Sequence, residues 1–230
     1  MTIKFNFFGK NCIIDRELAD RKDANRALVN IGFEASHLLL LNQVHGCEVA
    51  VIDEQGKIYG DQNLPKVDAL VTNLSDVVIG VITADCAPVL LFDEQKNVIG
   101  ASHAGWKGAR AGIIKSTIAA MKNLGAENIS VIIGPMIQQN SYEVSVDFFE
   151  DFMRESANNQ IFFINGNEGK YLFDLPAYVE KKLTDEGVIK IQNLKIDTYK
   201  EVEKFFSFRR SCHNGESDCG RNLSVIGVVK

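Results

Sequence analysis

The stretch that decides the fold reads Thr83-Ala84-Asp85-Cys86-Ala87-Pro88-Val89-Leu90-Leu91-Phe92 and continues, after a polar turn, as Val98-Ile99-Gly100-Ala101-Ser102-His103-Ala104-Gly105-Trp106-Lys107-Gly108. Two short apolar runs, 88–92 and 98–103, flank the turn, a pattern typical of two joined β-strands. Cys86 precedes the first run, and His103 ends the second. The pattern therefore predicts a β-hairpin with a thiol and an imidazole at the same end.

The length of the turn predicts the pairing of the two strands. A four-residue turn pairs Asp93 with Val98 and, by the same register, His103 with Pro88. Cys86 then lies two residues beyond that pair, and such diagonal neighbours are about 7–8 Å apart at Cα, within reach of their side chains. We expect Cys86 and His103 to meet directly or through a shared metal ion. The alternative is a buried cysteine near a hydrogen-bonded core histidine.

Residues beside the hairpin predict a polar pocket. Asp85 places a carboxylate in an apolar run, which is costly unless it has a partner or a chemical role. Gly105 and Gly108 allow close backbone approach where a helix begins, and free N–H groups at a helix start can bind an anion. Lys107 and Arg110 lie beside this start. The alternative for both cations is a solvated helix face.

A second histidine extends this pair into a possible metal site. His45 follows an apolar run at 38–44 and precedes a glycine. A catalytic zinc site uses three protein ligands and leaves one position for water or substrate. His45, Cys86 and His103 form such a set, although ligands from separate strands have no diagnostic spacing.

The composition excludes several classes of protein. The chain has 230 residues, 46% of them hydrophobic, and a net charge of −5, which does not favour a nucleic-acid partner. Polar residues interrupt the longest apolar stretch, 77–92, so we expect two buried strands there rather than a membrane span. Five irregularly spaced cysteines do not resemble a secreted disulfide framework, and the start lacks a signal-peptide pattern. We expect a cytoplasmic protein.

The remaining pattern predicts a mixed architecture. Helices are expected near 23–31, 106–124, 146–155 and 175–186, and further strands near 3–8, 38–44, 47–52, 67–71, 77–83, 129–133, 188–196, 205–209 and 223–229. Strands clustered in sequence, with single helices between them, favour one α+β (mixed α/β) domain over residues 1–230.

Three segments of the chain closely resemble signature blocks of one family. They are Asn42-Gln43-Val44-His45-Gly46, Thr83 to Leu91, and His103-Ala104-Gly105-Trp106-Lys107-Gly108. The family is the YfiH-like, or polyphenol oxidase (laccase) domain, family, whose members are described as purine nucleoside phosphorylases. Weaker matches extend the resemblance over roughly residues 38–230; they are Gly134-Pro135, Ser141-Tyr142-Glu143-Val144, Asp174-Leu175, Phe205 to Arg210, and Gly220-Arg221.

The resemblance implies a fold, a metal and a group of reactions. The implied fold is a single domain of packed mixed β-sheets flanked by helices, similar to the cysteine-hydrolase-like toxin domain. The implied zinc ligands are His45, Cys86 and His103. The implied activities are phosphorolysis of adenosine, inosine and S-methyl-5'-thioadenosine and deamination of adenosine, so the expected partners are a purine nucleoside and phosphate. One bacterial branch is described instead as a cytoplasmic amidase that edits peptidoglycan precursors.

Roles follow for individual residues under this interpretation. The catalytic candidates are Asp85, Cys86 and His103, with Asp85 moving a proton or orienting a ligand. The substrate-binding candidates are Gln43, Lys107, Arg209, Arg210 and Arg221. Surface salt bridges are the alternative for the three arginines. In an amidase, Cys86 could instead be a nucleophile with His103 as its base.

Two further hypotheses about the function concern the metal. A multicopper oxidase is not expected, because such sites need many imidazoles and the chain has four histidines: His37, His45, His103 and His213. One ion, zinc or a single copper, fits that number. A non-enzymatic zinc or nucleotide sensor is the remaining alternative.

A few positions depart from the family pattern. Lys10 lies where members often carry an arginine motif, and Met136 and Asp197 replace common cysteines. The segment Cys212 to Cys219 lengthens a loop and could form a second metal or redox site; we favour an exposed polar loop. These changes concern substrate preference rather than the proposed ligands.

Overall fold

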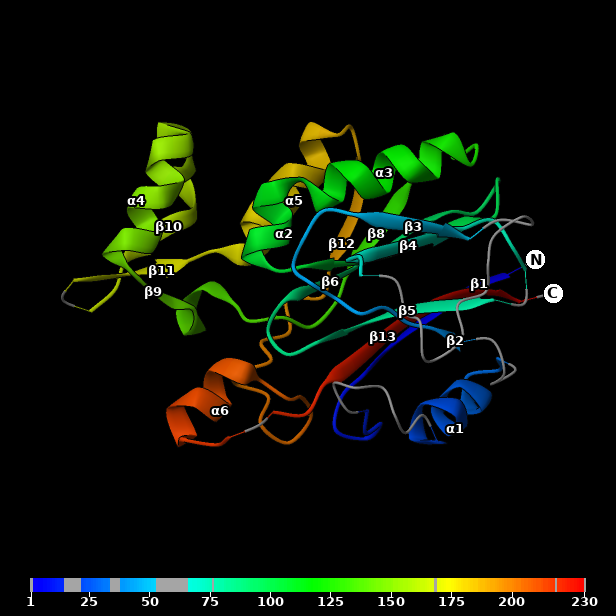
Figure 1. Cartoon of the computed structure of the whole chain (residues 1–230), viewed down its shortest axis with the longest axis horizontal. Coiled ribbons are helices and arrows are strands. Elements are labelled where there is room, and N and C mark those ends of the chain that lie inside the picture. Colours follow the sequence, from blue (N-terminus) through cyan, green and yellow to red (C-terminus); the bar gives the residue numbers. More distant parts are fainter. Residues whose placement is uncertain are drawn as a thin grey trace.

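A computed structural model of the chain describes residues 2–14, 22–33, 38–52, 66–75, 77–167, 169–217 and 219–229. Two mixed β-sheets form its centre (Figure 1). The six-stranded sheet has the order β12-β8-β6-β7-β4-β3, built from β3 (Val49–Ile52), β4 (Ala69–Thr72), β6 (Ala87–Asp93), β7 (Val98–Ala104), β8 (Ser130–Ile133) and β12 (Lys190–Asn193). The four-stranded sheet has the order β1-β13-β5-β2, built from β1 (Thr2–Phe8), β2 (Leu38–Leu39), β5 (Val78–Thr83) and β13 (Asn222–Val229).

The predicted hairpin is confirmed, together with its register. Strands β6 and β7 pair antiparallel, with Pro88 opposite His103 and Asp93 opposite Val98. Leu90 points into the core between the two sheets, whereas Val89 and Leu91 point to the opposite face. Both faces are covered, which explains why β6 is apolar almost throughout instead of alternating with polar residues.

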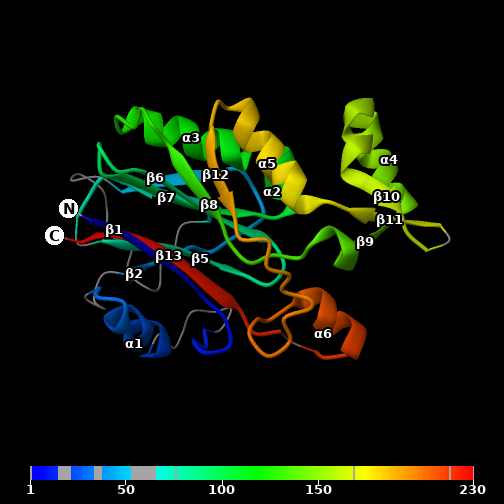
Figure 2. The ribbon, with the colours of Figure 1, turned by 180° about the vertical axis from the view of Figure 1, so that it is seen from behind.

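Helices cover the two outer faces of this pair of sheets. Helices α3 (Ile113–Asn123) and α5 (Leu175–Asp185) lie on the six-stranded sheet, and α1 (Lys22–Asn30) lies on the four-stranded sheet (Figure 2). Ile114, Ile118 and Met121 form the apolar face of α3, which is buried. The predicted single helix over 106–124 is wrong, because Gly112 has φ +101° and separates α2 (Trp106–Ala111) from α3. In the described part of the chain every helix is too short or too polar to cross a bilayer.

A smaller unit lies beyond the end of the two sheets, where Figure 1 places α4 (Val146–Glu155). Its antiparallel sheet has the order β10-β11-β9, from β9 (Glu143–Ser145), β10 (Phe163–Asn165) and β11 (Lys170–Phe173), with 3-10 helices η2 (Gln139–Ser141) and η3 (Ala157–Phe162) beside it. Aromatic rings form its core; Phe152 contacts Phe173 with ring centroids 5.0 Å apart. The sequence predicted α4 but missed these three short strands.

Two predicted strands differ from the structure near the hairpin end. Residues 205–209 do not form a strand; they lead into α6 (Phe208–Asn214), whose first turn Ser207 caps by accepting a hydrogen bond from Arg210 N at 3.2 Å. The strand expected over 38–44 ends at Leu39. The side chain of Gln43 then replaces backbone pairing to β5, donating to Ile82 O at 2.7 Å and accepting from Ile82 N at 2.8 Å.

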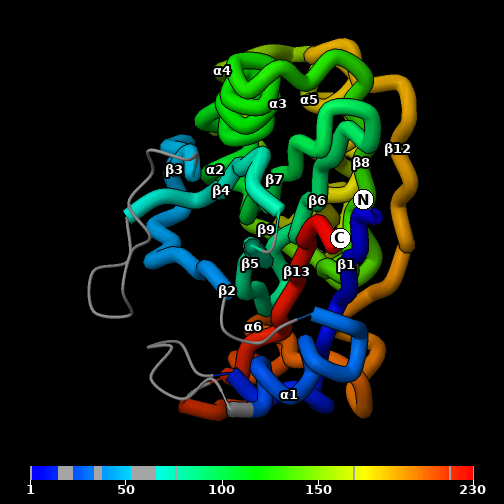
Figure 3. Tube along the Cα trace, turned by 90° about the vertical axis from the view of Figure 1, so that its right-hand side faces the viewer, coloured from blue at the N-terminus to red at the C-terminus, as the bar shows by residue number. Residues whose placement is uncertain are grey.

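The two ends of the described chain lie side by side (Figure 3). Strands β1 and β13 pair antiparallel from Thr2 opposite Val229 to Phe8 opposite Leu223. The last strand lies between β1 and β5, so the four-stranded sheet is completed only when the C-terminal segment has been added.

Candidate metal centre

Two imidazoles and a thiol converge at the end of the hairpin. The ligand atoms of His45, Cys86 and His103 lie within 4.8 Å of one another, and among the described residues they form the only group of this kind. His45 Nε2 is 4.0 Å from Cys86 Sγ, and the two imidazole centroids are 4.7 Å apart. The donors come from the turn after β2, the start of β6 and the end of β7. This cluster, hereafter the His-Cys-His cluster, could hold a metal ion.

A buried carboxylate holds two of the three donors. Asp68 is 0% exposed, and its Oδ1 accepts from His103 Nδ1 at 2.8 Å and from His45 N at 2.9 Å. Its Oδ2 accepts from Gly46 N at 2.6 Å. These backbone bonds stabilise a turn in which His45 has φ +61°, a left-handed conformation that is uncommon outside glycine.

Asp68 also determines which nitrogen of His103 faces the cluster. Burial favours the protonated acid, but hydrogen bonds from His103, Gly46 and His45 outweigh it and lower the pKa of Asp68. An ionised carboxylate only accepts, so Nδ1 of His103 carries the proton and Nε2 remains for a ligand. The sequence analysis missed Asp68. The signal that singled out Asp85, a carboxylate within an apolar run, was also present at 67–71.

The cluster favours a thiolate. Burial alone would raise the pKa of Cys86, but the charge and hydrogen bond of His103, with those of His45, lower it to about 6. Burial alone would lower the pKa of His103, but the Cys86 thiolate and Asp68 raise it to about 9. The two side chains therefore stabilise each other as a thiolate and an imidazolium when no metal is bound.

The glycines after β7 serve packing against the cluster. A Cβ on Gly105 would lie 2.8 Å from Cys86 Sγ, and one on Gly108 would lie 2.9 Å from Gly46 O. Both distances are too short for a side chain. Helix α2 has six residues, and Arg110 donates to Glu155 Oε2 at 2.7 Å across to α4. Close packing therefore explains why Gly105 and Gly108 are glycines, and the Glu155 contact explains the position of Arg110. The anion site expected at the start of α2 is not needed to account for these residues.

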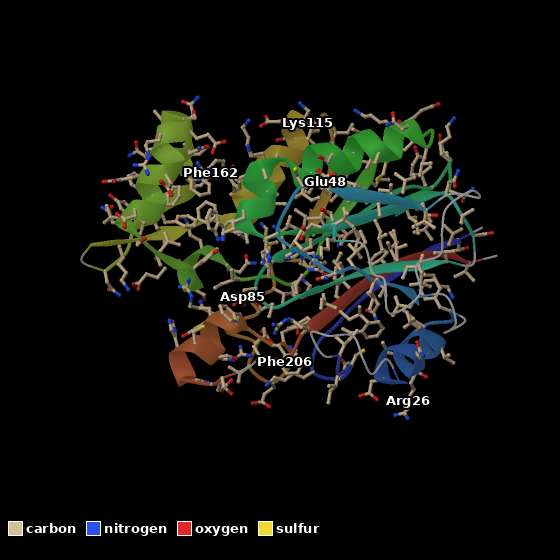
Figure 4. All side chains as sticks on the ribbon, viewed as in Figure 1. Arg26, Glu48, Asp85, Lys115, Phe162 and Phe206 are labelled. Carbon is tan, nitrogen blue, oxygen red and sulfur yellow. The ribbon has the colours of Figure 1, made fainter. Side chains whose placement is uncertain are left out.

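The cluster opens onto a cavity of about 350 Å³. It is lined by Leu41, Asn42, Gln43, His45, Ile82, Thr83, Ala84, Cys86, His103, Phe208 and Arg221. Arg221 is the one permanently charged side chain among these lining residues. Figure 4 labels Asp85 in this region, between the strand ends and α6. The cavity brings together segments that lie far apart in the sequence.

Asp85 lies beside the cavity and is held by two hydrogen bonds. Its carboxylate accepts from Thr198 Oγ1 and from Arg209 N, both at 2.7 Å. Its backbone has φ +89°, so the chain turns sharply just before Cys86. Gln43 lines the cavity, but its amide is hydrogen-bonded to Ile82.

Three other predicted substrate-binding residues contact protein groups outside the cavity. Lys107 is exposed, with Nζ 5.5 Å from the Trp106 ring centroid. Arg209 donates to Glu143 O at 2.6 Å, and Arg210 donates to Thr198 O at 2.7 Å. These three cations do not line the cavity, whereas Arg221 does.

The C-terminal loop does not form a second metal cluster within the described residues. Cys212 is exposed and Cys219 is buried. His213 Nδ1 lies 2.9 Å from Tyr199 Oη.

The family model described as multi-copper polyphenol oxidoreductase laccase matches residues 11–229. The chain belongs to this family. It is 39% identical over 217 residues to purine nucleoside phosphorylase RC0672 of Rickettsia conorii, covering 94% of this chain and 87% of the relative. It is 36% identical over 191 residues to adenosine deaminase RL5 from an unknown prokaryotic organism, covering 79% and 73%. The crystal structure of Neisseria meningitidis protein NMB0706 matches with a TM-score of 0.79 and 28% identity, over 99% and 95% of the chains.

The resemblance found in the motifs is confirmed, and so is the mixed α+β fold. The family description names a multi-copper oxidoreductase, whereas the described part of this chain gathers two imidazoles and one thiol in a single cluster. His37 lies outside the described residues, and His213 contacts Tyr199. The donors that are placed fit one ion.

Proposed function

We propose that this protein is a zinc-dependent purine nucleoside enzyme that phosphorolyses adenosine, inosine and S-methyl-5'-thioadenosine and deaminates adenosine. The observation that carries the proposal is the His-Cys-His cluster in the wall of a cavity beside a permanent cation. The names of two relatives, a purine nucleoside phosphorylase and an adenosine deaminase, support the substrate class. Its partners are then small molecules, a nucleoside and phosphate.

The donor set supports zinc as the metal. Imidazole nitrogen and thiolate sulfur are the usual zinc ligands, and three protein ligands leave a position for substrate or water. The low pKa of Cys86 and the free Nε2 of His103 prepare both groups for a cation. When bound, zinc acts as a Lewis acid at the group that faces it.

Three other residues have defined roles in this proposal. Asp68 keeps His103 in the required tautomer and holds the His45 turn. Arg221 binds phosphate during phosphorolysis, because it lines the cavity and, among the described residues, its hydrogen bonds are made by Nη1, to Cys219 O and Gly220 O. Asp85 positions Cys86 and α6 through Arg209 and Thr198 rather than exchanging a proton with substrate.

The proposal also places the protein in the cytoplasm. Four of the five cysteines, Cys12, Cys47, Cys86 and Cys212, are free thiols. A reducing compartment keeps thiols in this state and preserves Cys86 as a ligand.

Metal analysis combined with turnover tests the function. Purified protein should contain about one zinc per chain and should release hypoxanthine from inosine with phosphate and inosine from adenosine without it. Cys86→Ala should lose both activities together with the metal. Arg221→Gln should raise the KM for phosphate and leave phosphate-independent deamination largely unchanged. Protein with full zinc and no turnover of any of the three nucleosides would contradict the proposal.

An amidase acting on peptidoglycan precursors is the second candidate. One observation favours it: Asp68, His103 and the Cys86 thiolate are arranged like the orienting acid, base and nucleophile of a cysteine hydrolase. Such an enzyme should cleave a muropeptide precursor after complete chelation. The zinc enzyme should lose its activity on chelation and regain it with zinc.

A further inference from the structure

Phe208 is an exposed aromatic side chain that lines the metal-site cavity. It is 58% exposed and lines the same cavity as His45, Cys86 and His103. Other rings of the described residues pack against one another, for example Phe148 and Phe152 at 4.9 Å, but none of them packs on Phe208. A large apolar side chain left open beside donor groups is typical of a ligand site rather than a core.

The backbone on both sides of Phe208 is fixed. Ser207 Oγ caps α6, and the next residue, Arg209, donates its N–H to Asp85 at 2.7 Å. Asp85 is itself held by Thr198 Oγ1 and directly precedes Cys86. A single hydrogen bond therefore joins the segment of Phe208 to the segment of a proposed metal ligand. The ring of Phe208 is therefore exposed on a backbone segment that hydrogen bonds hold in place.

The cavity has a size and a chemistry that suit a flat heterocycle with a polar substituent. Its volume of about 350 Å³ lies within the range of roughly 300–1,000 Å³ typical of small-molecule sites. Leu41 and Ile82 add apolar surface, whereas Arg221 adds a positive charge. Every purine has a π-face that stacks on an aromatic ring, whatever its exocyclic groups.

We propose that Phe208 is the residue on which the purine base stacks, in the cavity that Phe208 shares with the His-Cys-His cluster and Arg221. This inference rests on the proposed function, and it explains how one site accepts adenosine, inosine and S-methyl-5'-thioadenosine. Stacking recognises the ring face, which these substrates share, and ignores the 6-position, at which inosine differs from adenosine and S-methyl-5'-thioadenosine. Phe208 is therefore a substrate-binding residue for the base, separate from the groups that bind phosphate and metal.

The two products of inosine phosphorolysis separate this role from a general effect on the cavity. Hypoxanthine contains the base, and ribose 1-phosphate contains the sugar and the anion. The zinc-loaded protein and its Phe208→Ala and Phe208→Tyr variants should be titrated with each product as an inhibitor. Phe5→Ala, which removes another partly exposed phenylalanine on β1, is the matched control.

Phe208→Ala should weaken hypoxanthine inhibition about 10-fold or more, the order expected for loss of base stacking. It should raise the KM for inosine similarly and leave inhibition by ribose 1-phosphate within about twofold. Phe208→Tyr, which keeps the ring, should retain wild-type affinities, and Phe5→Ala should behave as wild type.

Two results would overturn the inference while the proposed function stands: hypoxanthine inhibition that is unchanged in Phe208→Ala, or equal weakening of both products. Equal weakening would mean that the side chain supports the shape of the cavity instead of binding the base. A wild-type protein that turns over no purine nucleoside would overturn the proposed function itself, and this inference with it.

Discussion

At the scale of single residues, Asp68 organises the site although it is not a ligand. One carboxylate fixes the tautomer of His103, the left-handed backbone of His45 and the position of Gly46. A partner of this kind raises metal affinity by holding ligands in the bound geometry before the ion arrives. The sequence pointed to His45, Cys86 and His103 but not to Asp68, because the partners of Asp68 lie in other segments of the chain.

Replacing Asp68 with asparagine tests this role. Asp68→Asn keeps the size of the side chain but puts an amide N–H₂ where one oxygen now accepts a backbone or imidazole N–H. Zinc affinity should fall about 10- to 100-fold, measured by competition with a chromogenic chelator. Asp93→Asn is the matched control, since Asp93 lies at the other end of β6. Unchanged zinc affinity in a folded Asp68→Asn protein would show that Asp68 does not hold the ligands.

At the scale of elements, sequence patterns predicted those helices and strands whose formation depends on residues close together in the sequence. The β6–β7 hairpin, its register and the α4 and α5 helices follow from local apolar runs and capping residues such as Asp174, whose side chain accepts from Ala177 N at 2.9 Å. Residues 205–209 were predicted as a strand because their phenylalanines favour strands. Arg209 N instead donates to Asp85, which lies 124 residues away in sequence. Such long-range partners leave no local signal.

Asp93, at the hairpin turn, is a buried carboxylate outside the His-Cys-His cluster, and its contribution to stability can be tested. Asp93 is 1% exposed and accepts four backbone N–H groups, from Gln95, Lys96, Glu127 and Asn128, at 2.7 to 3.1 Å. It thereby joins the β6–β7 turn to the segment that precedes β8. Burial alone would raise its pKa, but these bonds outweigh burial and lower it.

The lowered pKa determines how the stability changes with pH. The contribution of Asp93 is complete above the unfolded pKa of about 3.9 and is lost as the pH falls through the lower folded pKa. Asp93→Asn should reduce the free energy of unfolding by about 2–4 kcal/mol at pH 7, because two of the four N–H donors lose their acceptor and the other two keep only an uncharged one. Urea unfolding at pH 7 and pH 3 should show this difference shrinking at the lower pH. A difference that is constant with pH would contradict an ionised Asp93.

At the scale of the whole molecule, the site is assembled from both sheets. The His45 turn follows β2 of the four-stranded sheet, whereas Cys86 directly precedes β6 and His103 lies near the end of β7, both strands of the six-stranded sheet. Phe208 and Arg221 reach the same cavity from the C-terminal part of the chain. Family motifs pointed to the three residues of the His-Cys-His cluster from the sequence. Only the folded chain shows that Arg221 lines the cavity while Lys107, Arg209 and Arg210 do not.

A metal ion held between the two sheets should stabilise the whole fold. An ion that binds only the folded chain adds RT ln(1 + [L]/Kd) to its stability, about 2.7 kcal/mol when free zinc is 100 times Kd. For a chain of this size, that corresponds to a rise in Tm of roughly 5–10 °C. Calorimetry of chelated protein should show the lower Tm, and adding zinc should restore the higher one. Cys86→Ala should lack the zinc-dependent shift, whereas Asp93→Asn should start from a lower Tm and retain it. A Tm independent of zinc in the unmodified chain would mean that the cluster does not bind the ion in the folded state.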